Sequence, residues 1–176
     1  MALTDTDLVA RVLASADHGA FAELVRRHQS PVRAFLRRMT GSDCHLADDL
    51  AQETFLKAWK KMHTFRGDAK LLTWLLGIAF NEFRGEARRR KMDAFEEVGD
   101  AGLERSAGSG APNSNLKLDL ADALNELNLN ERGAILLCCQ NGLSHSEAAE
   151  VLGCPIGTVK TNVLRGKEKL KRRLSV

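Results

Sequence analysis

The sequence predicts an all-α protein built from two small helical domains, an N-terminal helical bundle and a C-terminal helix-turn-helix, joined by a flexible linker. Apolar residues recur at three- and four-residue spacing along most of the chain, which is the period of an amphipathic helix. Neither half shows convincing alternation of apolar and polar residues, so strands are not expected. Residues 96–115 lose this periodicity and are rich in Gly, Ser, Ala, Pro and Asn. We therefore expect domains at residues 1–92 and 115–176, with the linker at 93–114.

The first half is expected to fold as a four-helix bundle. Polar or Gly-containing stretches divide its amphipathic segments. The expected helices cover residues 5–15, 18–40, 45–63 and 71–90.

The second half is expected to contain four shorter helices, near residues 115–127, 130–141, 144–152 and 156–173. Ser144 followed by Glu147 is the pattern of a capping box, which satisfies the free amides at the start of a helix. Gly153 suits a helix stop that needs positive φ, and Pro155 suits the first turn of the next helix. Two short helices that meet at such a turn predict a helix-turn-helix.

The last helix has a core face and a polar face by its spacing. The residues expected in the core are Val159, Val163, Gly166, Leu170 and Leu174. Those expected to point away are Thr158, Lys160, Thr161, Asn162, Arg165 and Lys169. A face of hydroxyls, amides and cations suits a DNA groove. The alternative is a solvated surface helix whose basic end merely complements the helix dipole.

The charge of the chain is unevenly distributed, although the net charge is only +3. Residues 84–92 carry five basic residues and one acidic residue, and residues 160–176 carry seven basic residues and one acidic residue. Two separated basic patches suggest a polyanion that is contacted twice. No apolar run is long enough to span a membrane, and the N-terminus lacks a signal-peptide pattern, so we expect a cytoplasmic protein without membrane insertion.

Catalytic, metal and cofactor sites are not expected. The sequence has no phosphate-binding G-x-x-x-x-G-K loop, nucleophile motif or paired carboxylates in a pocket-like context. The cysteines Cys44, Cys138, Cys139 and Cys154 form no C-x-x-C pair, which fits reduced thiols in a core. A redox or metal switch at Cys44 with His45, or at Cys138 with Cys139, is the open alternative.

The third expected helix has an acidic side opposite its apolar side. Asp48, Asp49, Gln52 and Glu53 surround Leu56 on this polar side. An apolar residue ringed by acids is typical of a protein contact. A solvated face with one stray leucine is the alternative.

Several segments resemble one family in the family's order and spacing. DDLAQETFLKAW at residues 48–59 and FRGDAKLLTWLLGIAFN at residues 65–81 resemble regions two-point-two to two-point-four of bacterial extracytoplasmic-function (ECF, group 4) sigma factors of RNA polymerase. Residues 20–41 resemble the preceding helix of that family, and the helix-turn-helix resembles its region four.

The resemblance implies that Asp48, Asp49, Gln52, Glu53 and Leu56 dock on the β′ clamp helices of core RNA polymerase. It also implies that residues 64–70 and the next helix open the minus-ten promoter element and hold it as a single strand. On that helix an aromatic ring, an amide and two cations fall along one side, a mixture that suits single-stranded DNA. The expected minus-ten residues are Arg66, Lys70, Trp74, Asn81, Arg84 and Arg88. Core packing is the alternative role for Trp74, because its neighbours are apolar.

The resemblance further assigns minus-thirty-five contacts to Pro155, Gly157, Thr158, Lys160, Thr161, Leu164 and Arg165. The chain departs from the family pattern at Leu72, Gly85, Asn162 and Gly166, so its minus-ten preference is expected to be unusual. An anti-sigma protein is the regulator that the resemblance implies. A stand-alone DNA-binding regulator that uses only residues 144–173 is the competing function.

Overall fold

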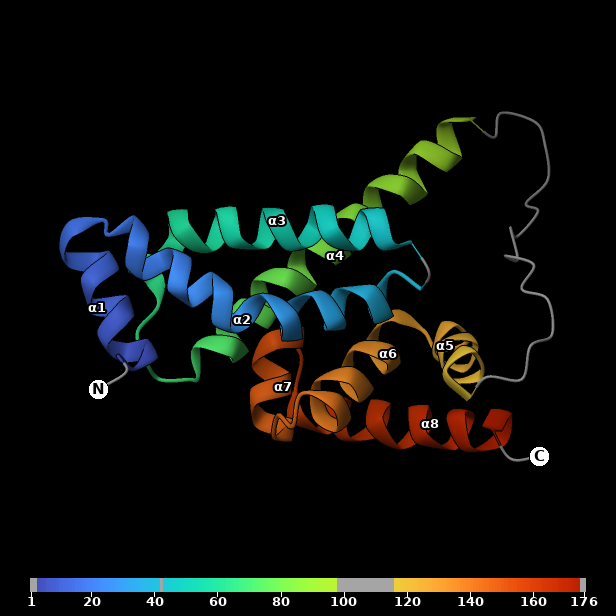
Figure 1. The fold of residues 1–176 in the computed structure, drawn as a ribbon. Coiled ribbons are helices and arrows are strands. Elements are labelled where there is room, and N and C mark those ends of the chain that lie inside the picture. The colour runs from blue at the N-terminus through green and yellow to red at the C-terminus, as the bar shows by residue number, and fades with distance from the viewer. Residues whose placement is uncertain (1–2, 42, 98–115, 175–176) are drawn as a thin grey trace.

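The computed structural model describes residues 3–41, 43–97 and 116–174 of the 176-residue chain, and these residues form helices joined by short turns (Figure 1). The helices of the N-terminal bundle are α1 (Asp5–Ser15), α2 (His18–Met39), α3 (Cys44–Lys61), the short 3-10 helix η1 (Met62–Thr64) and α4 (Leu71–Glu97). Those of the C-terminal bundle are α5 (Leu116–Asn125), α6 (Leu129–Ile135), the π-helix η2 (Leu136–Gln140), α7 (His145–Leu152) and α8 (Ile156–Leu174). No strand occurs within the described ranges. The all-α prediction is therefore confirmed.

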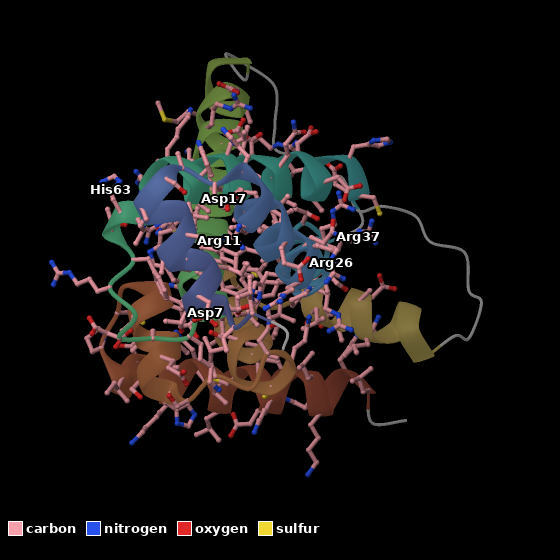
Figure 2. The ribbon with its side chains drawn as sticks, turned by 60° about the vertical axis from the view of Figure 1, so that its left-hand side comes forward. Asp7, Arg11, Asp17, Arg26, Arg37 and His63 are labelled. Carbon is pink, nitrogen blue, oxygen red and sulfur yellow. The ribbon has the colours of Figure 1, made fainter. Side chains whose placement is uncertain are left out.

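Side-chain caps begin most of these helices at the expected places. Thr4 and Asp7 form a capping box at α1, and the Asp17 carboxylate accepts the Ala20 amide at α2. Asp17 also pairs with Arg11 at 2.7 Å, which ties the end of α1 to the start of α2 (Figure 2). The predicted Ser144 to Glu147 capping box is present.

The helix α4 is longer than the sequence suggested. It continues through residues 93–97, which were expected to begin the linker. In Figure 1 this C-terminal part of α4 projects beyond the bundle. The remainder of the expected linker, residues 98–114, lies outside the described residues.

The buried side chains form one continuous apolar cluster. Phe35, Leu36 and Leu76 are fully buried in the N-terminal bundle, and Leu137 and Val159 in the C-terminal bundle. The two bundles meet where α4 packs on α7 and where α2 packs on α6 and η2. This cluster includes residues of both bundles, so the two predicted domains share buried apolar surface.

Two predictions for α8 are wrong. Asn162 was expected to face away but is only 9% exposed, because it lies three residues after Val159 and four before Gly166, on the same side of the helix. Leu174 was expected in the core but is 39% exposed in the last turn of α8. Val159, Val163 and Gly166 are buried as predicted.

Candidate functional site

The polar side of α3 carries the predicted polymerase-binding residues, which we call the docking face: Asp48, Asp49, Gln52, Glu53 and Leu56. The opposite side of α3 is buried through Ala47, Leu50, Ala51, Thr54 and Ala58. Because that side of α3 is buried, the docking face is directed toward solvent. Leu56 is 46% exposed, and Asp49 and Glu53 make no ion pair within the described residues. Their charges are therefore free for a partner.

Asp48 differs from the other acids of the docking face because arginines of α2 approach it. Its Oδ1 atom lies 3.7 Å from Arg33 Nε and 3.5 Å from an Arg37 guanidinium nitrogen. These are ion-pair distances without a hydrogen bond, and the Oδ1 atom is buried. Asp48 thus helps to join α3 to α2 as well as bordering the exposed face.

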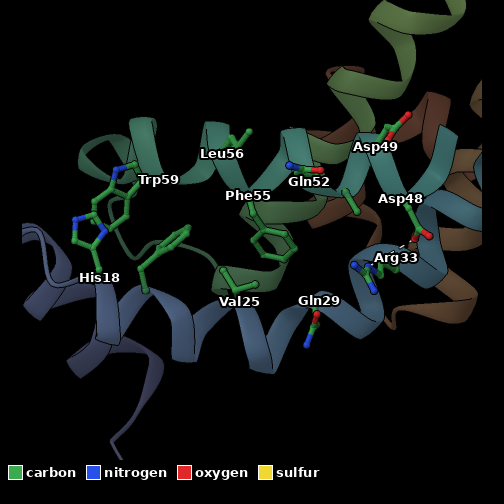
Figure 3. Close-up of a pocket in the computed structure, with 12 residues that line it drawn as sticks. His18, Val25, Gln29, Arg33, Asp48, Asp49, Gln52, Phe55, Leu56 and Trp59 are labelled. Carbon is green, nitrogen blue, oxygen red and sulfur yellow. Dashed lines mark ion pairs between the residues drawn. The ribbon is translucent and has the colours of Figure 1, made fainter. Parts of the chain in front are cut away.

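A groove of about 600 Å³ runs between α2 and α3 beside the docking face (Figure 3). Phe21, Val25, Phe55 and Trp59 form its apolar lining, and Gln52 lies on its edge. The His18 ring stacks on Trp59 with centroids 4.6 Å apart, and the Phe21 ring meets Trp59 edge-on at 5.0 Å. The groove gives the docking face an apolar side next to its acidic one.

Sequence reasoning missed the contribution of α2 to this groove. His18, Phe21, Val25 and Gln29 recur at three- and four-residue spacing, so they share one face of a helix. That local signal was available. The spacing did not show that this face of α2 pairs with α3.

The predicted minus-ten residues lie in the loop at residues 65–70 and along α4. Arg66, Lys70, Asn81, Arg84 and Arg88 are exposed. The three arginines make no ion pair within the described part of the chain, so they remain available for phosphates. Trp74 is half-buried, with its ring tilted against Phe65 at a centroid distance of 5.4 Å. Trp74 therefore packs partly against the core, which was the alternative role, and part of its side chain remains accessible to solvent.

A second cleft, of about 570 Å³, separates α3 from α4 and is lined by Asn81 and Gly85. Across it the Lys57 ammonium donates to Glu82 Oε2 at 2.6 Å. Glu53 of the docking face lines the same cleft, so the predicted polymerase and minus-ten surfaces adjoin each other there. Lys57 and Glu82 were not predicted, because their pairing joins residues on two different helices.

Arg90 also lines the cleft between α3 and α4. Its guanidinium binds Glu86 Oε1 at 2.9 Å and lies 3.5 Å from Asp43 Oδ2. The hydrogen bond from Arg90 is the main cause that lowers the pKa of Glu86. The Leu46 amide is the main cause that lowers the pKa of Asp43. Both carboxylates therefore stay charged, and the Arg90–Asp43 contact joins α4 to the N-cap of α3 while Glu86 orients Arg90 from within α4.

The helix-turn-helix consists of α7 and α8, with Gly153 between them at φ 63°. All the predicted minus-thirty-five residues are exposed: Pro155, Gly157, Thr158, Lys160, Thr161, Leu164 and Arg165. Leu164 is the most exposed large apolar residue in the described chain, at 60%. The Thr161 hydroxyl donates to the Gly157 carbonyl at 3.0 Å, so it is occupied within α8.

Two contacts fix α8 against α6. At Gly166 a Cβ atom would lie 2.8 Å from Ile135 Cγ1, so glycine permits the close approach of the two helices. The Lys169 ammonium donates to both oxygens of the buried Glu131, at 2.7 and 3.0 Å. Burial acts to raise the pKa of Glu131, but Lys169 and the Asn128 amide lower it more, and the net shift is downward. These contacts orient the exposed face of α8.

The α7 helix approaches the predicted minus-ten loop. Hydrogen bonds from Ser144 are the main causes that lower the pKa of Glu147, and the positive charge of Lys70 adds to them. Lys70 belongs to the N-terminal bundle and Glu147 to the C-terminal one. Lys70 of the predicted minus-ten surface is therefore within electrostatic range of an acid at the start of α7.

No cluster that could hold a metal ion is found among the described residues. Cys44 and Cys139 are exposed, while Cys138 and Cys154 are half-buried. Burial is the main cause that raises the pKa of the Cys138 thiol, which makes it less reactive. Within the described ranges, none of the helices has the length and apolarity to cross a bilayer.

Comparison with known proteins gives a consistent match over both bundles. Residues 24–92 match Sigma-70 region 2, and residues 117–170 match Sigma-70, region 4. The ECF RNA polymerase sigma-E factor of Haemophilus influenzae is 31% identical, with 98% of this chain and 96% of the relative covered. The ECF RNA polymerase sigma factor SigW of Bacillus subtilis is 32% identical, with 90% of each chain covered.

Solved structures agree with the sequence matches. The sigma factor RpoE from Bartonella quintana, in complex with the anti-sigma factor NepR, superposes with a TM-score of 0.75 at 34% identity. That match covers 89% of this chain and 97% of RpoE. CnrH, in complex with the cytosolic domain of CnrY, gives a TM-score of 0.71 at 28% identity and covers 97% and 96% of the two chains. Region 2, region 4 and near-complete coverage of these relatives together mean that the chain belongs to the ECF sigma factors of RNA polymerase.

Proposed function

We propose that this chain binds core RNA polymerase and directs it to promoters that carry its own minus-ten and minus-thirty-five elements. The observation that carries the proposal is the outward docking face on α3, with a predicted DNA surface on each bundle. The docking face offers Asp49, Glu53 and Leu56 to the β′ clamp helices, and the groove beside it adds an apolar surface.

The two DNA surfaces have different chemistry, which suits their different targets. Along the loop and α4, Trp74, Asn81 and the arginines offer stacking, an amide and positive charge to a single strand. Along α8, Thr158, Lys160 and Arg165 offer donors to a duplex groove and its phosphates. In this proposal the chain makes and breaks no bonds, since catalysis belongs to the polymerase, and it acts in the cytoplasm.

We further propose that an anti-sigma protein controls the chain. A relative of 34% identity was solved in complex with an anti-sigma factor, and its match covers most of this chain. The groove between α2 and α3 and the docking face are open surfaces that such a protein could cover in competition with polymerase.

Run-off transcription tests the proposed function. Purified core polymerase is incubated with genomic DNA fragments, with or without this chain. We expect discrete transcripts that appear only when the chain is present. DNA protection by the chain alone, with no new transcript from polymerase, would instead identify a stand-alone DNA-binding regulator.

A further inference from the structure

Two cations on one edge of α8 differ in what they contact. Lys169 follows Arg165 by four residues, so the two side chains are neighbours one helical turn apart. Arg165 is exposed and makes no ion pair within the described part of the chain. Lys169 instead donates to both carboxylate oxygens of Glu131, at 2.7 and 3.0 Å, which occupies two of the three donors of a lysine ammonium. Arg165 is therefore available to a DNA phosphate, whereas Lys169 is already bound.

The pair depends on how closely α8 approaches α6. Glu131 is only 3% exposed, and the Asn128 amide of the α6 capping box donates to its Oε2 atom at 3.2 Å. A Cβ atom at Gly166 would lie 2.8 Å from Ile135 Cγ1, so glycine permits the close approach of the two helices. Lys169 follows Gly166 by three residues and therefore reaches Glu131. Gly166 is one of the positions at which the chain departs from the family pattern, so the pair depends on a feature of this chain.

A free ammonium at position 169 would bind DNA of any sequence. Every duplex presents the same phosphates, so a contact between lysine and phosphate adds affinity without sequence information. Lys169 is one turn from Arg165, a predicted minus-thirty-five residue, and is therefore close enough to meet the phosphates that border this element. Discrimination is a ratio of affinities, and added binding to random sequence lowers it. The carboxylate of Glu131 prevents this contact, because it neutralises the charge of Lys169 and occupies its donors.

We propose that Glu131 is a specificity-determining positioning residue, which withholds Lys169 from DNA phosphates so that α8 discriminates its minus-thirty-five element from random sequence. Glu131 itself touches no DNA and acts through Lys169. The inference rests on the proposed function for the identity of the element, whereas the withholding of Lys169 applies to any duplex.

The salt dependence of DNA binding tests the withholding. The affinity of the full-length chain for a random duplex is measured by fluorescence anisotropy at a series of salt concentrations. The slope of log affinity against log salt counts phosphate contacts, at about 0.9 per contact. Glu131→Gln keeps the shape of the side chain and can still complete the capping box, but it frees Lys169. We expect its slope to be steeper than that of the wild type by about 0.9, with tighter binding to the random duplex.

Two further variants separate the withheld cation from a simple change of charge. Glu168→Gln is the matched control, because Glu168 is an exposed acid of α8 that makes no ion pair within the described residues, and the slope should stay at the wild-type value. Glu131→Gln with Lys169→Met has the net charge of the wild type and should also return the slope to that value. Circular dichroism checks the fold, and the double variant decides the question if Glu131→Gln alone unfolds. A double-variant slope that is shallower by about 0.9 would show that Lys169 already binds phosphate in the wild type.

The complex of core polymerase with this chain tests the discrimination. Its affinity is compared between a promoter fragment found by run-off transcription and the same fragment with a scrambled minus-thirty-five element. Glu131→Gln should lower this ratio of affinities roughly three- to tenfold, and the double variant should restore it.

An unchanged slope for Glu131→Gln would overturn the proposal, and so would a steeper slope with an unchanged ratio. A wild-type complex that does not distinguish the two fragments would contradict the proposed function. The slopes on random DNA would then still decide whether Glu131 withholds Lys169.

Discussion

Glu131 shows how one buried side chain positions the surface that we assign to DNA. It caps α6 through Asn128 and binds Lys169 of α8 with both oxygens, while it is only 3% exposed. Its pKa is lowered on balance, so the folded state favours the charged carboxylate. The pair therefore stabilises the position of α8 at pH 7.

Replacing Lys169 by Met should lower the free energy of unfolding at pH 7 by about 1–2 kcal/mol, because it leaves the buried carboxylate without its cation. The range is modest because the Lys169 side chain is 41% exposed. A carboxyl with a lowered pKa stabilises the fold above the unfolded value, about 4.3 for Glu, and this contribution disappears as the pH falls through the folded pKa. The difference between variant and wild type should therefore shrink from pH 7 to pH 4.

Urea unfolding at the two pH values measures this difference. Arg173→Ala is the control, since its pair with Glu126 is exposed on both sides and should contribute nothing measurable. An equal loss at pH 7 and pH 4 for Lys169→Met would show that the charge of Glu131 is not the cause.

Individual residues also show where local sequence is insufficient. Asn162 carries a polar amide, so it was assigned to the outer face, yet its position in the helical repeat places it beside Val159 and Gly166. Its Nδ2 atom is buried without a hydrogen-bond partner. The prediction that Asn162 faces away from the core was therefore wrong.

At the scale of elements, the sequence predicted most helices because their ends are determined locally. The capping box at Ser144 and the positive φ of Gly153 depend on residues within one or two turns. The outward docking face of α3 was predicted for the same reason. The groove beside it was not, because it requires α2 and α3 to pair in a specific register.

Reversing the charge of the docking face should weaken its binding to core RNA polymerase. Asp49→Lys with Glu53→Lys replaces two exposed acids four residues apart on α3, and core polymerase should then bind at least tenfold more weakly in a quantitative pull-down. Asp122→Lys with Glu126→Lys is the control, with the same charge change and spacing at two exposed positions, Asp122 in α5 and Glu126 just after its end, where only an exposed pair with Arg173 is lost. Equal binding by the two double variants would exclude α3 as the docking helix.

At the scale of the whole molecule, both bundles and their family could be predicted, but not their contact. Phe80, Gly133 and Leu152 are far apart in the sequence, and each has an ordinary role within its own helix. Their fit becomes visible only when α4, α6 and α7 are assembled. The described molecule therefore has its two bundles in direct contact, through α4 with α7 and α2 with α6.

The central claim is that this chain binds polymerase and promoter DNA together and opens the minus-ten element. Permanganate mapping of unpaired thymines on a promoter identified by run-off transcription tests it most directly. We predict reactive thymines in the minus-ten element only when core polymerase and this chain are both present, and none with either alone. Reactivity with polymerase alone, or no reactivity with both, would contradict the account.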